Sequence, residues 1–214
     1  MLISSYNPDS LGDTLLLILG EDESSQTSKQ VGDVVAITAA SGATIGYNFF
    51  NVSKIIGEIT GRGQVQLSEK QIDALNTAIA AAGFTQELVA DTKPKFVVGV
   101  VGELKAHPDS DHLHVAQVDL GGYTKQIVCG APNVAQGQHV VAALPGAMMP
   151  DGKIIWPGAL RGVSSYGMLC AARELALPNA PQKRGILILP DELAAGTAFT
   201  TEMGVSALAT QAQD

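Results

Sequence analysis

Histidine and aspartate residues cluster in one short segment of the second half of the chain. The segment HPDSDHLH contains His107, Asp109, Asp111, His112 and His114. Imidazole and carboxylate groups are ligands in many transition-metal sites, and His112 and His114 share one face if their segment is a strand. Turn and surface roles account for the same residues without a metal. We therefore expect no metal here. A metal-dependent or hydrolytic enzyme is kept as the third of three functional hypotheses, and the other two follow from the sequence blocks described below.

Nucleophilic chemistry has few candidates in this sequence. Cys129 and Cys170 are the only cysteines, and both lie in apolar surroundings typical of buried, unreactive thiols. Two cysteines provide neither a disulfide framework nor a four-ligand zinc site, so a reducing cytoplasm is the simplest location. No segment fits the phosphate loop G-x-x-x-x-G-K-[ST]. We predict a protein that is not an enzyme and has no cofactor.

Basic side chains in the second half suit contact with phosphate groups instead. Each of five cations could neutralise one phosphate, although a solvated surface position is the commoner fate of such a side chain. Arg161 is the strongest candidate, because a planar guanidinium can hold a phosphate through two hydrogen bonds. The five residues are Lys105, Lys125, Lys153, Arg161 and Arg173.

Three uncharged residues are further RNA-contact candidates, each with a structural alternative. Ser165 precedes a segment that resembles a helix start, so it either caps that helix or joins an RNA-binding surface. The amide of Asn133 suits ribose or base edges, but an asparagine after a proline also suits a plain turn. Met168 is either a core residue or a soft contact to RNA.

Charge is unevenly distributed along the 214 residues. The formal net charge is −8, which argues against a polyanionic partner for the chain as a whole. Residues 1–94 carry 5 basic and 11 acidic groups, whereas residues 95–214 carry 8 basic and 10 acidic groups. The second half can therefore present a basic patch. Aromatic residues make up only 5%, which favours structured RNA over single strands that stack on aromatic rings.

The first half predicts a small α+β domain over residues 1–90. Apolar runs predict strands at 15–19, 33–38 and 45–50, and the polar stretch 21–30 is typical of a loop. Ser68 and Gln71 form a capping-box pattern ahead of a helix that ends at Gly83. A polar, proline-containing link follows at residues 90–94.

The second half predicts an all-β OB-fold barrel over residues 95–203, followed by a tail at 204–214. Short strands are expected at 96–106, 113–120, 124–129, 139–144 and 186–190, and CAARELAL at 170–177 has a helical pattern. No apolar run reaches the roughly 18 residues of a membrane helix, and the N-terminal segment lacks the basic start of a secretory signal. We expect no membrane association.

Four blocks of the second half closely resemble a known domain. They read VVGVVGELKAHPDSDHLHVAQVDLG, QIVCGAPNVAQGQHV, ALPGAMMPDGKI and LRGVSSYGMLCAAREL. Over residues 95–203 they resemble the tRNA-binding domain of bacterial phenylalanyl-tRNA synthetase β subunits. The first half, with GYNFFNVS and the Ser68 helix, looks like that of free-standing YtpR-type tRNA-binding proteins. One departure is His112, where relatives often carry lysine.

The resemblance implies non-catalytic binding of structured RNA, above all tRNA, through an OB-fold surface that contacts phosphates and sugars. It matches Ser165 to the family's S-x-G-M block and Asn133 to its loop asparagine, and it implies a homodimer. The alternative is a protein-interaction module that has lost RNA affinity and docks to an aminoacyl-tRNA synthetase. The charge of −8 and the His112 departure favour that alternative.

Overall fold

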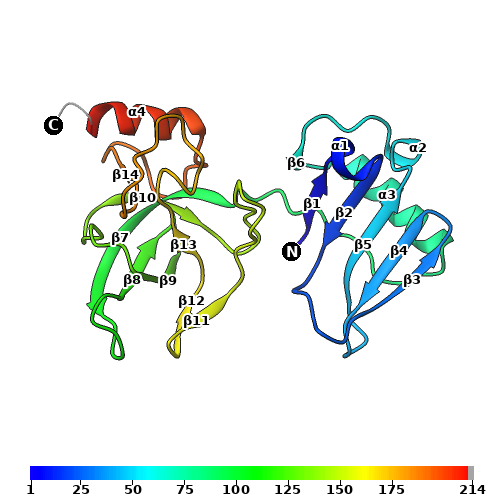
Figure 1. The fold of residues 1–214 in the computed structure, drawn as a ribbon, viewed down its shortest axis with the longest axis horizontal. Coiled ribbons are helices and arrows are strands. Elements are labelled where there is room, and N and C mark those ends of the chain that lie inside the picture. Colours follow the sequence, from blue (N-terminus) through cyan, green and yellow to red (C-terminus); the bar gives the residue numbers. More distant parts are fainter. Residues whose placement is uncertain (212–214) are drawn as a thin grey trace. The chain divides into compact units, whose positions relative to one another are not determined.

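The computed structural model describes residues 1–211 as two compact units, which divide between Lys93 and Pro94 (Figure 1). The elements of the first unit are β1 (Ile3–Tyr6), α1 (Pro8–Leu11), β2 (Thr14–Ile18), β3 (Thr27–Val31), β4 (Val34–Thr38), β5 (Thr44–Phe50), α2 (Ser53–Ile56), β6 (Gly63–Gln64) and α3 (Glu69–Ala81).

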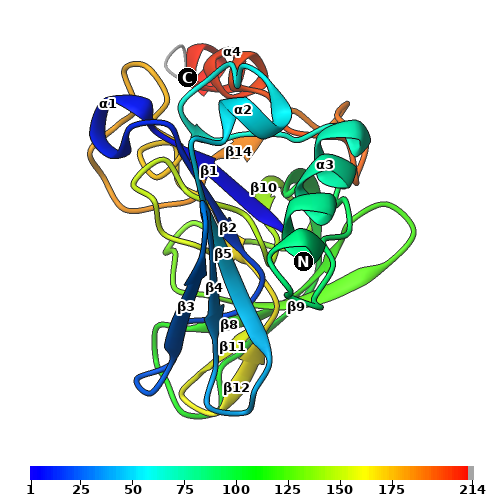
Figure 2. The ribbon, with the colours of Figure 1, turned by 90° about the vertical axis from the view of Figure 1, so that its right-hand side faces the viewer.

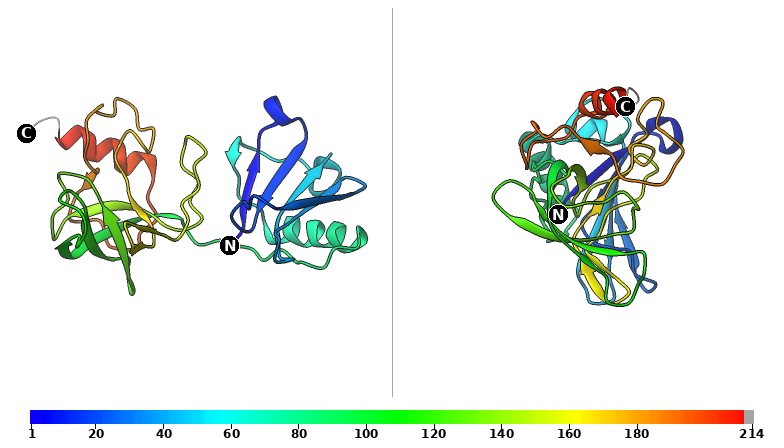
Figure 3. Two further views of the ribbon diagram at one scale, coloured as in Figure 1. Left: turned by 60° about the horizontal axis from the view of Figure 1, so that its bottom comes forward. Right: turned by 90° about the vertical axis from the view of Figure 1, so that its left-hand side faces the viewer.

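The first unit is a six-stranded sheet with one long helix on one face. The strand order is β3-β4-β5-β2-β1-β6, and each pair is antiparallel. Helix α3 lies along the sheet (Figures 2 and 3) and buries Ile72, Leu75 and Ile79 against β2 and β5. Its start is the expected capping box, in which Gln71 N donates to Ser68 Oγ and Ser68 N donates to Gln71 Oε1.

The expected strands at 15–19, 33–38 and 45–50 are observed as β2, β4 and β5. The expected loop at 21–30 is wrong in part, because Thr27–Val31 forms β3. Every residue of β3 is exposed, and the strand is held by backbone pairing with β4 at the sheet edge. An edge strand without a buried face has no apolar pattern for a sequence to reveal.

The second unit contains a six-stranded sheet, a short hairpin and a C-terminal helix. The sheet order is β13-β10-β7-β8-β9, with β14 also paired to β10, and β11 pairs with β12. The bounds are β7 (Phe96–Ala106), β8 (His114–Asp119), β9 (Thr124–Cys129), β10 (His139–Ala143), β11 (Gly158–Leu160), β12 (Val163–Ser165), β13 (Met168–Leu169), β14 (Ile188–Leu189) and α4 (Thr201–Gln211).

Two core clusters pack against opposite faces of β7 and β10. Val101 and Val140 belong to one cluster, whereas Val98 and Val141 belong to the other together with Ala207 of α4. Burial on both faces explains why these strands read as continuous apolar runs. Residues 204–211, which we assigned to a tail, are part of α4, which lies beside β14 (Figure 1). Residues 212–214 of that tail lie outside the described residues.

The expected helix over residues 170–177 is wrong. The segment is a series of turns, in which Leu175 N donates to Ala171 O and Leu177 N donates to Ala172 O. Ala176 has a positive φ of 49°, which an α-helix excludes, and a proline follows at 178. Among the residues that the structure describes, no helix has the length and apolar character needed to cross a membrane.

Candidate nucleic-acid interface

Two adjoining hollows lie on the second unit, beside the loop after β9 and the segment that leads into β14. Their volumes are about 300 Å³ and 250 Å³. Both are small for a site that encloses a ligand, so they suit contact with one group on the surface of a larger molecule. Ala171, Arg184, Gly185 and Ile186 line both hollows.

Three exposed cations line these hollows. Arg173 lines the larger hollow, Lys183 lines the smaller one, and Arg184 lines both. Within residues 1–211, none of the three forms an ion pair with a carboxylate. Glu174 also lines the larger hollow, but its Oε2 accepts a hydrogen bond from Ala171 N at 2.7 Å. The hollows therefore carry an excess of positive charge.

Asn133 holds the segment that presents two of these cations. Its Nδ2 donates to Ile186 O at 2.9 Å, and its Oδ1 accepts from Ile186 N at 2.8 Å. Gly185 lies directly against this amide with a φ of 140°, and a Cβ there would be 2.9 Å from Asn133 Oδ1. Sequence reasoning offered RNA contact or a plain turn for Asn133. The structure gives its side chain a third role, that of a clamp between two loops.

Ser165 is buried, with 4% of its surface exposed, and lies in β12. Its Oγ accepts from Val128 N at 3.0 Å and donates to Gly167 O at 3.2 Å. The helix-cap interpretation is wrong, because no helix begins here and the hydroxyl joins β12 to β9. Met168 is half-buried, packs against the core and also lines the larger hollow.

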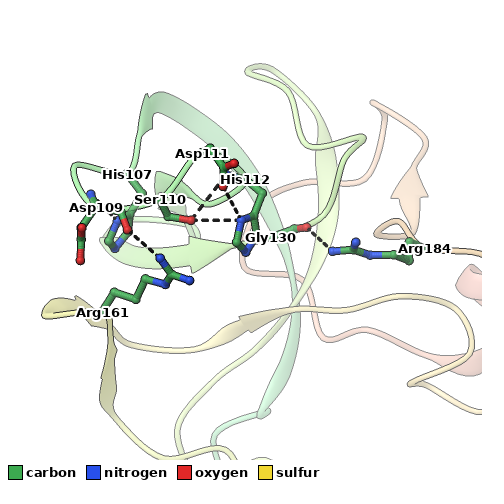
Figure 4. A network of polar contacts seen from close by, with 8 residues as sticks. All are labelled: His107, Asp109, Ser110, Asp111, His112, Gly130, Arg161 and Arg184. Carbon is green, nitrogen blue, oxygen red and sulfur yellow. Dashed lines mark hydrogen bonds and ion pairs between the residues drawn. The ribbon is translucent and has the colours of Figure 1, made fainter.

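The tip of the β11–β12 hairpin is tied to the loop at residues 107–112 (Figure 4). Arg161 Nη1 donates to Asp109 O at 3.0 Å. His107 is buried, and its Nδ1 accepts from Asp109 N at 3.0 Å, so its proton resides on Nε2, which donates to Leu160 O at 3.0 Å. Because Leu160 lines the larger hollow, these bonds position one of its walls.

Hydrogen bonds connect several members of the histidine–aspartate cluster. Both ring nitrogens of His107 are already bonded. His112 Nδ1 lies 2.8 Å from Asp111 Oδ1, and this hydrogen bond lowers the pKa of the Asp111 carboxyl (Figure 4). Within residues 1–211 there is no group of three or more histidine, cysteine, aspartate or glutamate side chains that could hold a metal ion.

Both thiols are poor nucleophiles in this fold. Burial raises the pKa of Cys129, and burial raises that of Cys170 to about 12. A raised pKa favours the protonated thiol, which is less nucleophilic than the thiolate.

The other sequence candidates lie outside the two hollows. Lys105 Nζ pairs with Glu103 Oε1 at 2.8 Å, and Lys125 Nζ lies 5.5 Å from the centroid of the Tyr166 ring. Lys153 is exposed in the turn before β11. Sequence reasoning missed Lys183 and Arg184, although they form the only Lys-Arg dipeptide in the chain. The structure thus groups Asn133, Met168 and Arg173 with that dipeptide and places Arg161 beside Leu160.

Comparison with known proteins supports an RNA-related family. Residues 96–198 match the family model "Putative tRNA binding domain", and residues 21–91 match a "Domain of unknown function". A protein of Bacillus subtilis (strain 168), "Putative tRNA-binding protein YtpR", is 46% identical over 196 residues, which are 91% of this chain and 97% of that protein. The chain belongs to the YtpR family. This membership confirms the resemblance seen in the sequence blocks.

This YtpR-family chain has further relatives that cover about half of its length. A phenylalanine–tRNA ligase beta subunit of Sulfurimonas denitrificans is 44% identical over 117 residues, covering 54% of this chain but only 15% of that subunit. Among solved structures, a MetRS related protein from Pyrococcus horikoshii matches 49% of this chain and 88% of its own, at 20% identity and a TM-score of 0.38.

Proposed function

We propose that the protein binds structured RNA, above all tRNA, through the second unit and without catalysing a reaction. The observation that carries this proposal is the group formed by Arg173, Lys183 and Arg184, three cations around adjoining hollows of a chain whose net charge is −8. A local excess of positive charge attracts a polyanion even where the whole protein repels it. The match of residues 96–198 to a tRNA-binding family model supports RNA as that polyanion.

The second unit acts as an OB-type barrel in this proposal. Tyr166 N donates to Gln126 O at 2.9 Å, and Gln126 Nε2 donates to Ser164 O at 2.7 Å. These bonds join the β9 edge of the sheet to the segment that leads into β13 at the opposite edge. A register shift between Val101 and Leu104 of β7 supports the strong coiling that closure requires.

Contact with phosphates and ribose fits the chemistry of this surface. The helices of a folded tRNA have A-form geometry, whose bases are poorly accessible to side chains, and shape recognition relies on phosphate and 2′-hydroxyl contacts. Guanidinium groups serve those contacts, and with Arg161 at the hairpin tip the face has a fourth cation near the larger hollow.

Titration of the full chain with bulk tRNA at several salt concentrations tests this function. We expect the logarithm of the binding constant to fall linearly with the logarithm of salt, by about 0.7 to 0.9 for each phosphate contacted. Arg161→Ala should weaken binding without unfolding the protein. Absence of binding near about 50 mM salt, where phosphate contacts are strong, would contradict the proposal.

A second candidate is a protein-interaction module that docks to an aminoacyl-tRNA synthetase in the cytoplasm, alone or as a homodimer. The observation that favours it is the acidity of the first unit, whose 5 basic and 11 acidic groups over residues 1–94 repel RNA. In that case the purified chain would bind a synthetase without RNA, and the complex would survive nuclease treatment. Light scattering of the free chain would report whether it is a dimer.

A further inference from the structure

We propose that Lys183, Arg184 and Arg173 form a subsite for the RNA phosphodiester backbone, and that the Asn133 side chain builds this subsite. The inference rests on the proposed function and adds the chemical group that the hollows recognise. Neither Lys183 nor Arg184 was expected from the sequence blocks, since both lie in the loop before β14 rather than within the motifs.

The loop that presents Lys183 and Arg184 has a defined conformation. Asn133 forms two hydrogen bonds with the backbone of Ile186, as a neighbouring strand would. Gly185 packs so closely against the Asn133 amide that a side chain at 185 would displace it. The loop that contains Asn133 is itself braced, because Gln138 Nε2 donates to Asn133 O at 2.9 Å. A prearranged loop loses less conformational entropy when it binds a ligand.

Both guanidinium groups are oriented but have donors to spare. Arg184 Nη2 donates to Gly130 O at 3.3 Å, and Arg173 Nη1 donates to Lys183 O at 3.2 Å. Each guanidinium has five N–H donors, so one backbone bond leaves most of the fork available. Within residues 1–211 no carboxylate pairs with these groups, and Glu174, the acid in the larger hollow, is directed to a backbone amide.

A phosphodiester matches this arrangement better than a carboxylate-bearing protein partner. Two arginines and a lysine can surround one or two neighbouring phosphates, whose oxygens accept several hydrogen bonds at once. Among the described residues, Leu160 is the one exposed large apolar side chain that lines either hollow, whereas protein interfaces usually depend on a cluster of such anchors. Protein docking is therefore the competing outcome of the experiment rather than part of the proposal.

The experiment measures binding of bulk tRNA to the full chain against salt concentration. The double variant Lys183→Ala/Arg184→Ala should bind about tenfold or more weakly at low salt, and its log–log salt slope should be shallower by about 1.4 to 1.8 if two phosphate contacts are lost. Lys70→Ala in the first unit is the control, because this exposed cation lines neither hollow and is not an RNA-contact candidate, and the affinity of this variant should stay within about twofold of wild type.

A second variant separates the clamp from the charge. Asn133→Ala leaves every cation in place but removes both bonds to Ile186, so tRNA affinity should fall while amide exchange at Ile186 becomes faster. Arg184→Gln is a milder substitution for use if the double variant fails to fold. If the wild-type chain binds tRNA and the Lys183 and Arg184 variants match it in affinity and slope, the subsite is wrong and the function stands. If the wild-type chain ignores tRNA, both proposals fail.

Discussion

The two units use their polar side chains in different ways. In the first unit, Asp13 accepts hydrogen bonds from Ser53 and Tyr6, an arrangement that secures the start of α2. In the second unit, His107, Asn133 and Ser165 each bond to the backbone of a residue 37 to 53 positions away. Those bonds hold the loops and the hairpin around the hollows. Polar groups of the first unit stabilise the fold, whereas those of the second also shape a surface.

The cations at the hollows differ from two cations of the first unit, although Lys105 and Lys125 of the second unit are paired in the same way as those two. In the first unit, Arg62 pairs with Asp9, and Lys29 Nζ lies 6.0 Å from the centroid of the Phe84 ring. In the second unit, Arg173 and Arg184 bond to carbonyl oxygens, which orient a guanidinium without neutralising it. Net charge is therefore a poor guide to RNA binding. A ligand responds to the local electrostatic potential, which depends on how many of the nearby charges are paired.

The largest expected effect is that of Leu75→Ala, a substitution in the core of the first unit, on the free energy of unfolding. Leu75 is fully buried, so the cavity should cost about 3 kcal/mol of unfolding free energy in that unit. We expect tRNA affinity of the folded protein to stay within about twofold, because the hollows lie in the other unit. Denaturant unfolding and a tRNA titration below the unfolding transition measure both effects. A parallel loss of affinity would show that the first unit takes part in binding.

Elements with a buried face could be predicted from the sequence. Strands β2, β4 and β5 and helix α3 all have apolar residues at the spacing that burial requires, and the capping box marks where α3 begins. Strand β3 has no such signal, because its stability comes from hydrogen bonds to β4. The turns at 170–177 imitate a helix in composition, but Ala176 adopts a backbone conformation that composition does not specify.

The chemical character of the candidate site could be predicted from the sequence, but the residues that form it could be predicted only in part. The sequence identifies Asn133, Ser165 and Arg173 as notable residues, but the bonds of Asn133 and Ser165 are to the backbone of residues far along the chain. Those partners depend on how the loops fold over the sheet, which no local pattern encodes. Lys183 and Arg184 were missed for the same reason, because their loop reaches the hollows only in the folded unit.

Ser165→Ala tests whether the Ser165 hydroxyl of the second unit stabilises the fold or contacts RNA. The substitution leaves the buried Val128 N–H without its acceptor, which should cost about 1 to 3 kcal/mol of unfolding free energy. Because the Ser165 hydroxyl faces the protein, tRNA affinity measured on folded protein should change little. Ser164→Ala is the control, since Ser164 is exposed and accepts from Gln126 Nε2 through its backbone oxygen, which the substitution retains. Unchanged stability with lost affinity would instead assign Ser165 a direct RNA contact.

His107 offers two variants that separate its two bonds. His107→Gln retains a donor toward Leu160 O, whereas His107→Asn retains an acceptor for Asp109 N and releases the hairpin. We expect tRNA affinity to fall about tenfold for His107→Asn, the equivalent of one hydrogen bond, and much less for His107→Gln. If His107 acts by positioning Arg161, His107→Asn should have no further effect in an Arg161→Ala background. Additive losses would refute that role.

The smallest expected effect belongs to Asp13 in the first unit. Burial raises the pKa of Asp13, but hydrogen bonds from Ser53 and Tyr6 outweigh burial and hold it below its usual value. A lowered pKa means that Asp13 stabilises the fold above about pH 4 and that this contribution is lost as pH falls through the folded pKa. The difference in unfolding free energy between wild type and Asp13→Asn should therefore shrink between about pH 5 and pH 3, by less than about 1 kcal/mol because the carboxylate is only partly buried. Denaturant unfolding at a series of pH values measures this difference, and tRNA affinity at neutral pH should be the same for both proteins. An effect of Asp13→Asn on tRNA binding with no effect on stability would break the contrast between the two units.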